Sequence, residues 1–516
     1  MESTETTETK KRVVEQLLRK GVLVSPDLID KLDSITPLTK TPDDFLILSR
    51  EIECLIEKKK DVNWQEFEKL KVLFEKEKSS EPYKNFVTFL KAEEERAGEN
   101  DLKVVFSYAG ESRKRSYEDF VSLFAARYNA LRNMLQGRHG LQDVTSINRI
   151  NSRTEREKVS LIGLIQEKHI TKNKNMLLTV EDQTGSIRVL ISKNKPELYN
   201  MAKDLVHDEV IGISGVNGDK VVFANNLLWP DIPDKPLKKT DEDVFVVFLS
   251  DLHVGSKNFL PEEFNRFIKW INGQTGNEGQ RKIAEKVKYV FIAGDLVDGV
   301  GVYPEQNKEL EIDDIHSQYE ECARLLSQIP QRIKIIVCPG NHDSTRMSEP
   351  QPAFTDKTAK ALLSLPNIVS VSNPSILKIG VKEGFDGFTV LLYHGYSFDY
   401  YVANVDSIRQ QGGYDRADLL MKFLLQRRHM APAYSSTLYL PEIKDYLVID
   451  NPPDFFVTGH IHKTSVSNYK NTTLISGSCW QSKTLFQEKV GHHPEPAKVP
   501  VANLRTREIK ILKFGD

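Results

Sequence analysis

Five apolar segments in the second half of the chain have the pattern of buried β-strands. Each is a short run of β-branched, aromatic and other apolar residues, which is typical of a strand covered on both faces. They cover residues 244–250, 289–293, 333–338, 388–393 and 455–458. Each leads into Asp, Asn or His residues, most of them beside glycine. Because open α/β sheets place ligand sites at the carboxyl ends of their strands, the pattern predicts one site built from all five segments.

The residue types that follow the strands are those that bind divalent metals. They form the series Asp251-Leu252-His253, Gly294-Asp295, Gly340-Asn341-His342-Asp343, His394-Gly395 and Gly459-His460-Ile461-His462. An acid and an imidazole two positions apart in an extended segment point to the same side, so Asp251 and His253 are expected to act together. The glycines are expected to let the backbone turn sharply and approach a bound phosphate closely. One such motif is a weak signal, but five in order indicate a metal site.

This series resembles the calcineurin-like metallophosphoesterase superfamily, and the resemblance covers residues 242–516. It implies a C-terminal α/β sandwich that binds two metals. The implied ligands are Asp251, His253 and His462 for the first metal, Asn341, His394 and His460 for the second, and Asp295 as the bridge between them. His342 is implied to be a catalytic group that approaches the scissile phosphate. Asp343 and Asp298 are open to two interpretations, orienting a site residue or forming turn hydrogen bonds, and Asp298 is left out of the predicted site.

Two divalent cations held in this way activate a bridging water and stabilise an in-line displacement at phosphorus. Carboxylate, amide and imidazole ligands together suit Mn²⁺, Fe or Zn²⁺ better than Mg²⁺, which prefers oxygen ligands. We therefore expect two divalent ions, with manganese as the first choice. A protonated His342 would neutralise the transition state or protonate the departing oxygen.

Residues 155–235 differ in pattern from the rest of the chain. Short β-patterned segments alternate with turn signals at Gln183-Thr184-Gly185 and Asn217-Gly218. A helix is expected near residues 196–206, between the third and fourth strands, which is the arrangement of an OB-fold β-barrel. The strands offer few aromatic residues for stacking bases, so a DNA-binding role and a protein-contact role are both open.

The first 150 residues predict a separate module and a connection. Apolar stripes and helix-start signals indicate a small helical domain over residues 1–60. Residues 61–150 are rich in Lys and Glu and are expected to form a charged linker that carries an amphipathic helix at 119–135.

The composition of the chain further limits what kind of protein it can be. A chain of 516 residues is too long for one core and is expected to hold several domains. With 39% hydrophobic and 28% charged residues it should be soluble, and no run reaches the ~20 apolar residues of a membrane span. The polar start and four scattered cysteines indicate the cytoplasm. Because the net charge is only −2, any DNA contact must come from local patches, for which Arg427 and Arg428 are candidates.

The order of these parts resembles the small subunit of archaeal family-D DNA polymerases. The stretches RRHMAPAYSSTLYLPE (427–442) and VPVANLRTREIKILKF (499–514) are similar to that family too. The resemblance implies a metal-dependent 3′-to-5′ exonuclease acting on single-stranded or mismatched DNA ends, beside a large subunit that carries polymerisation. The alternatives are a catalytically silent scaffold, a stand-alone phosphatase or phosphodiesterase, and a repair nuclease of the same superfamily.

Overall fold

The computed structural model describes residues 23–24, 61–62, 101–110, 113–490 and 492–515. The chain divides into two units, residues 1–100 and 101–516. In the first unit, β1 (Leu23–Val24) pairs in parallel with β2 (Asp61–Val62). The helical domain predicted for residues 1–60, and the predicted linker up to residue 100, otherwise lie outside the described residues.

Two six-stranded sheets form the larger part of the second unit. The first has the order β12-β11-β10-β9-β18-β19, and the second has the order β16-β17-β15-β14-β13-β3. The strands of the first sheet are β9 (Phe245–Leu249), β10 (Val287–Ala293), β11 (Lys334–Cys338), β12 (Ile368–Ser370), β18 (Lys498–Asn503) and β19 (Ile509–Lys513). Those of the second are β3 (Leu102–Ser107), β13 (Ser375–Ile379), β14 (Phe388–Leu392), β15 (Phe455–Thr458), β16 (Ser465–Tyr469) and β17 (Thr472–Ser476). Both sheets mix parallel and antiparallel pairs, which gives a mixed α/β fold.

The five predicted strand segments are confirmed, but they belong to two sheets. β9, β10 and β11 are parallel neighbours in the first sheet, whereas β14 and β15 are parallel neighbours in the second. A fully buried apolar cluster joins the inner faces of the sheets. In it Phe248 of β9 packs against Phe455 of β15, with ring centroids 6.0 Å apart. The segments are continuously apolar because each strand lies between this shared core and a layer of helices.

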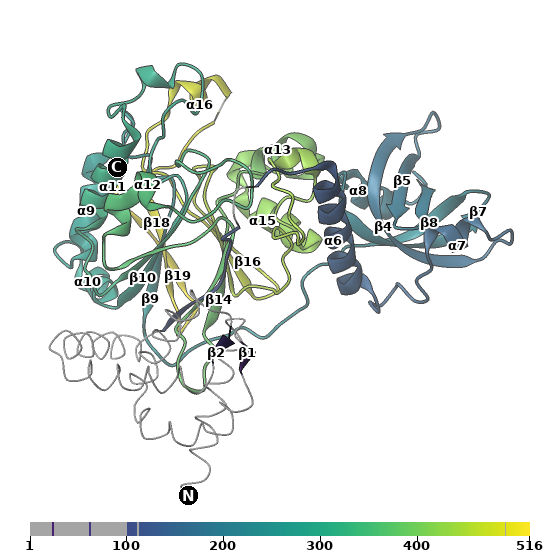
Figure 1. Ribbon diagram of the computed structural model, residues 1–516, viewed down its shortest axis with the longest axis horizontal. Helices are drawn as coiled ribbons and strands as arrows, with labels where there is room; N and C mark the ends of the chain where they lie inside the picture. Colours follow the sequence, from purple (N-terminus) through teal and green to yellow (C-terminus); the bar gives the residue numbers. More distant parts are fainter. Residues whose placement is uncertain (1–22, 25–60, 63–100, 111–112, 491, 516) are drawn as a thin grey trace, which may run out of the picture. The chain divides into compact units, whose positions relative to one another are not determined.

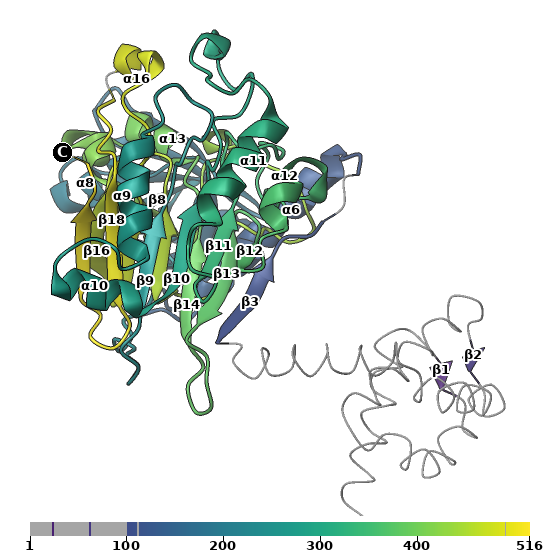
Figure 2. The same cartoon turned by 90° about the vertical axis from the view of Figure 1, so that its left-hand side faces the viewer.

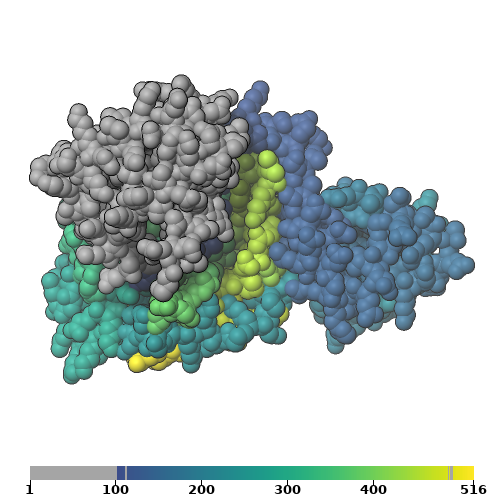
Figure 3. Space-filling view, turned by 60° about the horizontal axis from the view of Figure 1, so that its bottom comes forward, coloured from purple at the N-terminus to yellow at the C-terminus, as the bar shows by residue number. Residues whose placement is uncertain are grey.

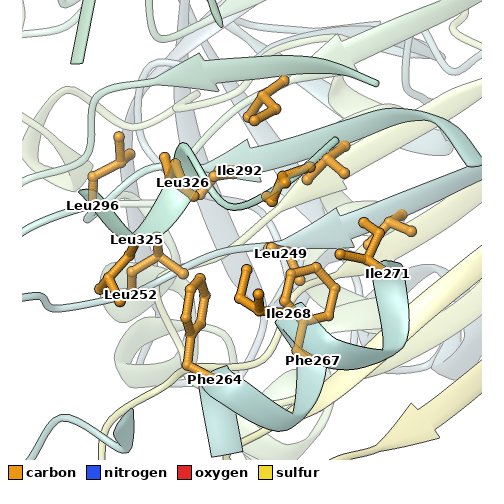
Figure 4. Close-up of a cluster of buried hydrophobic side chains, with 14 of the residues drawn as sticks. Leu249, Leu252, Phe264, Phe267, Ile268, Ile271, Ile292, Leu296, Leu325 and Leu326 are labelled. Carbon is orange, nitrogen blue, oxygen red and sulfur yellow. The ribbon is translucent and has the colours of Figure 1, made fainter. Parts of the chain in front are cut away.

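Helices cover the outer faces of both sheets. Over the first sheet lie α9 (Pro261–Ile271), α10 (Glu278–Glu285), α11 (Ile315–Leu326) and α12 (Asp356–Leu363) (Figure 2). α9 begins with Pro261 in its first turn and places Phe264, Phe267 and Ile268 on one face by helical spacing. Figure 4 shows these side chains directed at Leu249 of the sheet.

The second sheet is covered in the same way. Its helices are α13 (Phe398–Asn404), α14 (Asp406–Gln410) and α15 (Ala417–Arg427), which share a buried apolar cluster with β14 and β15. Short elements in the loops are α16 (Leu485–Val490) and the 3₁₀ helices η3 (Gln306–Lys308), η4 (Gly413–Asp415) and η5 (Tyr434–Ser436). Of the helices that the structure describes, none combines the length and apolar composition needed to cross a bilayer.

Between β3 and the other strands of the two sheets, the chain forms a closed five-stranded barrel with the order β4-β5-β6-β8-β7. Its elements are β4 (Lys158–Ile170), β5 (Met176–Asp182), β6 (Gly185–Ile191), α8 (Pro196–Lys203), β7 (Val210–Gly218) and β8 (Val221–Leu228). The helix predicted between the third and fourth strands is confirmed as α8. Alternate residues of each strand fill the interior. The barrel forms one lobe of this unit (blue in Figure 3).

The predicted amphipathic helix is confirmed as α6 (Tyr117–Leu135), and α7 (Ile147–Asn151) follows it. α6 lies between the barrel and the sheets (Figure 1), because its two faces bury different partners. Tyr128 packs on the barrel and donates a hydrogen bond to the carbonyl of Ile162, 3.1 Å away. On the other face, buried Arg127 forms an ion pair with Asp445 at 2.7 Å.

Residues 102–107 differ from the sequence prediction. They were expected to belong to a charged linker, but they form β3, the strand that pairs antiparallel with β13 at the edge of the second sheet. The partner strand lies about 270 residues further along the chain, so no local pattern indicates the pairing.

Candidate metal centre

Five of the seven residues predicted as metal ligands line one pocket of about 250 Å³, to which both sheets contribute, and Asp251 and His394 lie beside these five. In the first group, Nε2 of His253 lies 3.0 Å from Nε2 of His462. Oδ1 of Asp251 lies 3.5 Å from the same atom of His462. The acidic and imidazole donors of these three residues all lie within 4.8 Å of one another.

The second group lies against the first and shares Asp295 with it. Nε2 of His394 is 2.9 Å from Oδ1 of Asn341 and 3.3 Å from Oδ2 of Asp295. Nδ1 of His460 is 3.1 Å from the same Asn341 oxygen. The Asp295 carboxylate also lies 3.9 Å from Nε2 of His253, so it stands between the two groups.

Most of these side chains leave the backbone from left-handed turns. Positive φ angles occur at Asp251 (51°), His253 (52°), Asp295 (51°), His460 (73°) and His462 (54°). Each such non-glycine residue costs about 1–3 kcal/mol, and strain of this kind gathers at functional sites. The prediction of an extended Asp251-Leu252-His253 segment was wrong in its backbone. The two polar side chains still reach the same site, and Leu252 between them is buried in the apolar core.

For His253 and His394, the ring nitrogen that faces away from the centre is held by an acceptor. Nδ1 of His253 lies 3.0 Å from Oδ1 of Asp298, and Nδ1 of His394 lies 2.7 Å from the carbonyl of Ala293. A neutral ring therefore keeps its proton on Nδ1 and directs the Nε2 lone pair into the centre. Metal-ligating histidines are oriented in this way in proteins.

Lone pairs of neighbouring nitrogen and oxygen atoms face one another in the centre, and a positive charge between them would relieve their repulsion. For His394, Nε2 faces two oxygen acceptors, Asn341 Oδ1 and Asp295 Oδ2, which repel a lone pair unless a cation lies between them. Burial opposes protonation, but the neighbouring Asp295 carboxylate prevails and raises the pKa of His394 to about 10. Although it is buried, Asp295 has a pKa well below its ordinary range because of His394 and His342. Carboxylate, amide and imidazole donors around a cation-seeking position fit divalent metals.

Two glycines of the motifs make room for neighbouring residues that are predicted ligands. A Cβ added to Gly340 would lie 2.2 Å from Oδ1 of Asp295, and one added to Gly294 would lie 2.4 Å from Nδ1 of His394. Gly294 also has φ +86° and turns the chain sharply, as predicted. The space at both positions is taken by ligand side chains rather than left open toward the pocket.

The known proteins that this chain is similar to agree with a metal-binding site of this kind. Residues 246–464 match the family described as calcineurin-like phosphoesterase. The DNA polymerase II small subunit of Methanothermobacter thermautotrophicus is 40% identical over 416 residues, which cover 80% of this chain and 83% of that protein. The chain belongs to the archaeal DNA polymerase II small subunit family. The member from Archaeoglobus fulgidus is 37% identical over 428 residues, which cover 83% of this chain and 83% of that protein. Among solved structures, an archaeal phosphodiesterase shares 13% identity over 52% of this chain and 99% of its own, with a TM-score of 0.26.

In this member of the DNA polymerase II small subunit family, His342 lines the pocket beside the predicted ligands. Its Nδ1 lies 2.7 Å from the carbonyl oxygen of Asp298, which leaves Nε2 as the ring's free nitrogen. Burial lowers the pKa of His342, against the opposing effect of Asp295. The neighbouring Asp343 does not touch that ring. It accepts hydrogen bonds from Gly340 N at 2.8 Å and Tyr319 Oη at 3.0 Å, so it holds the loop.

Several residues of the site were not predicted from the sequence. Asp298 holds His253 as described above. Asp399 on α13 lies 2.9 Å from Nε2 of His460, and Gln487 on α16 lies 2.9 Å from Nδ1 of His462. His492, in the loop after α16, lines the same pocket. Of these residues, only Asp298 could have been found from the sequence, because it lies three positions after Asp295 in the motif that begins at Gly294. Asp399 and His492 lie outside every motif.

The two candidate DNA-binding arginines are unavailable to a phosphate in this structure. Arg427 is buried and forms an ion pair with buried Glu209 of the barrel at 2.7 Å. Arg428 is buried too and donates from Nε to the carbonyl of Ile449 at 2.7 Å. A basic pair in a polar stretch resembles a phosphate site in the sequence, and only the fold reveals that both side chains face inward.

Proposed function

We propose that this chain is the metal-dependent 3′-to-5′ exonuclease subunit of a heteromeric archaeal DNA polymerase, acting on single-stranded or mismatched DNA ends. One observation carries the proposal: carboxylate, amide and imidazole groups from five strand ends in two sheets meet in one place, close enough to share a metal ion. A catalytically silent scaffold has no need for five strained backbone positions at one pocket. The family of the chain supports the polymerase context.

The proposed ligand roles follow the two groups. Asp251, His253 and His462 hold one metal, Asn341, His394 and His460 hold the other, and Asp295 serves both. When bound, the two ions activate a water as nucleophile and stabilise the attacking and leaving oxygens at phosphorus. We propose manganese, because the mixture of imidazole, amide and carboxylate donors suits it better than magnesium.

His342 acts on the substrate in this proposal. The carbonyl of Asp298 holds its Nδ1 and fixes the ring, so Nε2 is the atom that meets the phosphodiester. A phosphodiester is anionic, so its approach favours the protonated ring and opposes the lowering of the pKa by burial. A proton on Nε2 then neutralises charge in the transition state or passes to the departing oxygen.

The roles of the other domains are proposed from their strand order and from the names of the relatives. We propose that residues 155–235 are an OB-fold, because the strand order β4-β5-β6-β8-β7 with a helix between β6 and β7 fits that topology. Residues 242–516 with β3 form the phosphoesterase domain. The relatives are named small subunits, so we propose a large polymerase subunit as the partner, bound through the phosphoesterase domain and barrel. Deletion of residues 1–100, which leaves β3 and α6 intact, should then preserve the complex, and its loss would contradict this assignment.

The test of the activity uses the purified chain, Mn²⁺ and 5′-labelled DNA, either single-stranded or as a mismatched primer-template. We expect shortening from the 3′ end that His342→Ala and Asp295→Asn both abolish. His139→Ala, which replaces an exposed histidine outside the pocket, is the matched control and should leave cleavage unchanged. No cleavage with any metal, with and without the large subunit, would favour the scaffold. Hydrolysis of a nitrophenyl diester without DNA cleavage would favour a phosphodiesterase acting on small substrates.

A further inference from the structure

A second, larger hollow adjoins the metal pocket. Its volume is about 660 Å³, and its walls come from α13, the loop before it and η5. We call it the tyrosine groove, and its main lining residues are Tyr396, Asp399, Tyr400, Tyr434, Leu438 and Tyr439. The volume is within the range of about 300–1,000 Å³ typical of ligand sites.

The groove contains apolar surface that none of the described residues covers. Tyr434 is 45% exposed and Leu438 is 53% exposed. Tyr434 is nevertheless held in place, because its ring stacks on Tyr439 at 5.4 Å with an interplanar angle of 11°. Its backbone N–H also donates to the carboxylate of Asp208 at 2.9 Å. A rigid aromatic ring with one side on the protein and much of its surface in water is a platform for stacking.

The groove and the metal pocket share a wall. Tyr396 and Asp399 line both hollows. The ring of Tyr396 contacts the ring of His460 edge-on, with centroids 5.7 Å apart, and the Asp399 carboxylate holds Nε2 of the same histidine. The two hollows are therefore continuous past Tyr396, which leaves a path from the metal pocket into the groove.

The residues that line the tyrosine groove suit one part of a nucleic-acid strand better than another. Within the described part of the chain, the residues that line the groove include no lysine or arginine. Nucleobases are uncharged and stack on aromatic rings without regard to sequence, whereas phosphates require positive charge. Apart from Asp399, whose carboxylate contacts His460, the named lining of the groove consists of tyrosines, hydroxyl groups and leucine, which suits bases.

We propose that the tyrosine groove binds unpaired nucleobases of a single strand whose phosphodiester lies at the metal centre. This inference rests on the proposed function and extends it: the groove takes only bases that are free of a complementary strand. Such a groove would admit a frayed or mismatched 3′ end and exclude a paired one, so the discrimination is made by stacking beside the centre.

The test measures binding rather than cleavage. Fluorescence anisotropy with the full chain in EDTA compares a labelled single-stranded oligonucleotide with a copy that carries abasic sites near its 3′ end. We expect the wild type to bind the abasic copy about 5- to 100-fold more weakly, as stacking on aromatic side chains predicts. Tyr400→Leu and Tyr434→Leu should reduce this ratio, and Tyr434→Phe, which keeps the ring, should retain it.

The matched control is Phe223→Leu, which removes an exposed aromatic ring from β8 of the barrel. This substitution should leave the ratio unchanged. A ratio that survives both leucine variants, or that is lost in Phe223→Leu, would overturn the proposal and move the base contacts elsewhere. So would a wild type that does not distinguish the two oligonucleotides. Because no cleavage occurs in EDTA, failure of the proposed nuclease activity would appear separately.

Discussion

Nδ1 of His253 lies 3.0 Å from Oδ1 of Asp298, and both side chains are buried. The Asp298 carboxylate is itself fixed, because the side-chain amides of Gln306 and Gln481 each donate to it at 3.1 Å. Despite burial, the pKa of Asp298 is lowered by His253 and Gln306, so the carboxylate stays charged. The His253 ring is thereby held in one tautomer with its lone pair toward the metal centre.

Asp298→Asn should weaken metal binding without removing a proposed ligand. The amide replaces a charged acceptor and places an N–H group against a neighbouring glutamine amide. We expect Mn²⁺ affinity to fall about 10- to 100-fold, as for other residues that orient metal ligands. Titration of the metal-free chain with Mn²⁺, followed by electron paramagnetic resonance, measures this directly. Asp313→Asn, at an exposed acid, is the control, and equal affinities of the two variants would contradict the role of Asp298.

His342→Ala should separate catalysis from metal binding. If His342 acts on the phosphodiester, its loss lowers kcat about 10²- to 10⁴-fold while the Mn²⁺ affinity stays at the wild-type value. Single-turnover cleavage of single-stranded DNA and a metal titration on the same preparation provide both values. A parallel fall in metal affinity would place His342 among the ligands instead.

Asp445→Asn should destabilise the protein in a pH-dependent way. Burial raises the pKa of Asp445, but Arg127 and His429 lower it more, so the folded pKa lies below the unfolded value of about 3.9. The stabilisation is therefore complete above about pH 4 and is lost as the pH falls through the folded pKa. Breaking the buried pair at pH 7 is expected to cost about 3–5 kcal/mol.

Urea unfolding from pH 7 downward measures this effect as the gap in unfolding free energy between wild type and variant. The gap should be constant at first and should shrink below about pH 4. Asp450→Asn breaks an exposed ion pair with Lys444 and should cause a far smaller loss. A gap that widens as the pH falls would contradict the assignment of the charge to Asp445.

Arg427→Met should act on stability, with no direct effect on DNA contact. It leaves Glu209 buried without its partner, which is expected to cost about 3–5 kcal/mol. Adding Glu209→Gln should restore part of the loss, because the remaining side chain is then uncharged. Thermal unfolding of the two variants measures this, with Arg409→Met at an exposed ion pair as the control. If Arg427→Met unfolded at the wild-type temperature and its DNA binding depended less on salt, Arg427 would instead be a DNA contact.

The sequence by itself determined the strands that carry the site and the chemistry at their ends. Segments such as 289–293 are apolar throughout because both faces are covered, so the strand and its ending at Asp295 are visible locally. The barrel was predictable too, because its turn signals separate strands that are close in the sequence and α8 lies between two of those strands. The residue types of the proposed ligands, from Asp251 to His462, follow from the same local reading.

Only the tertiary structure decided how these parts meet. It divided the five strands between two sheets, made residues 102–107 an edge strand beside β13, and turned Arg427 inward to Glu209. It also brought Asp399 and the tyrosine groove to the centre. These relationships join residues far apart in the chain through packing and charge pairing. Local patterns of apolar and polar positions specify what each segment buries, but not which distant segment covers it.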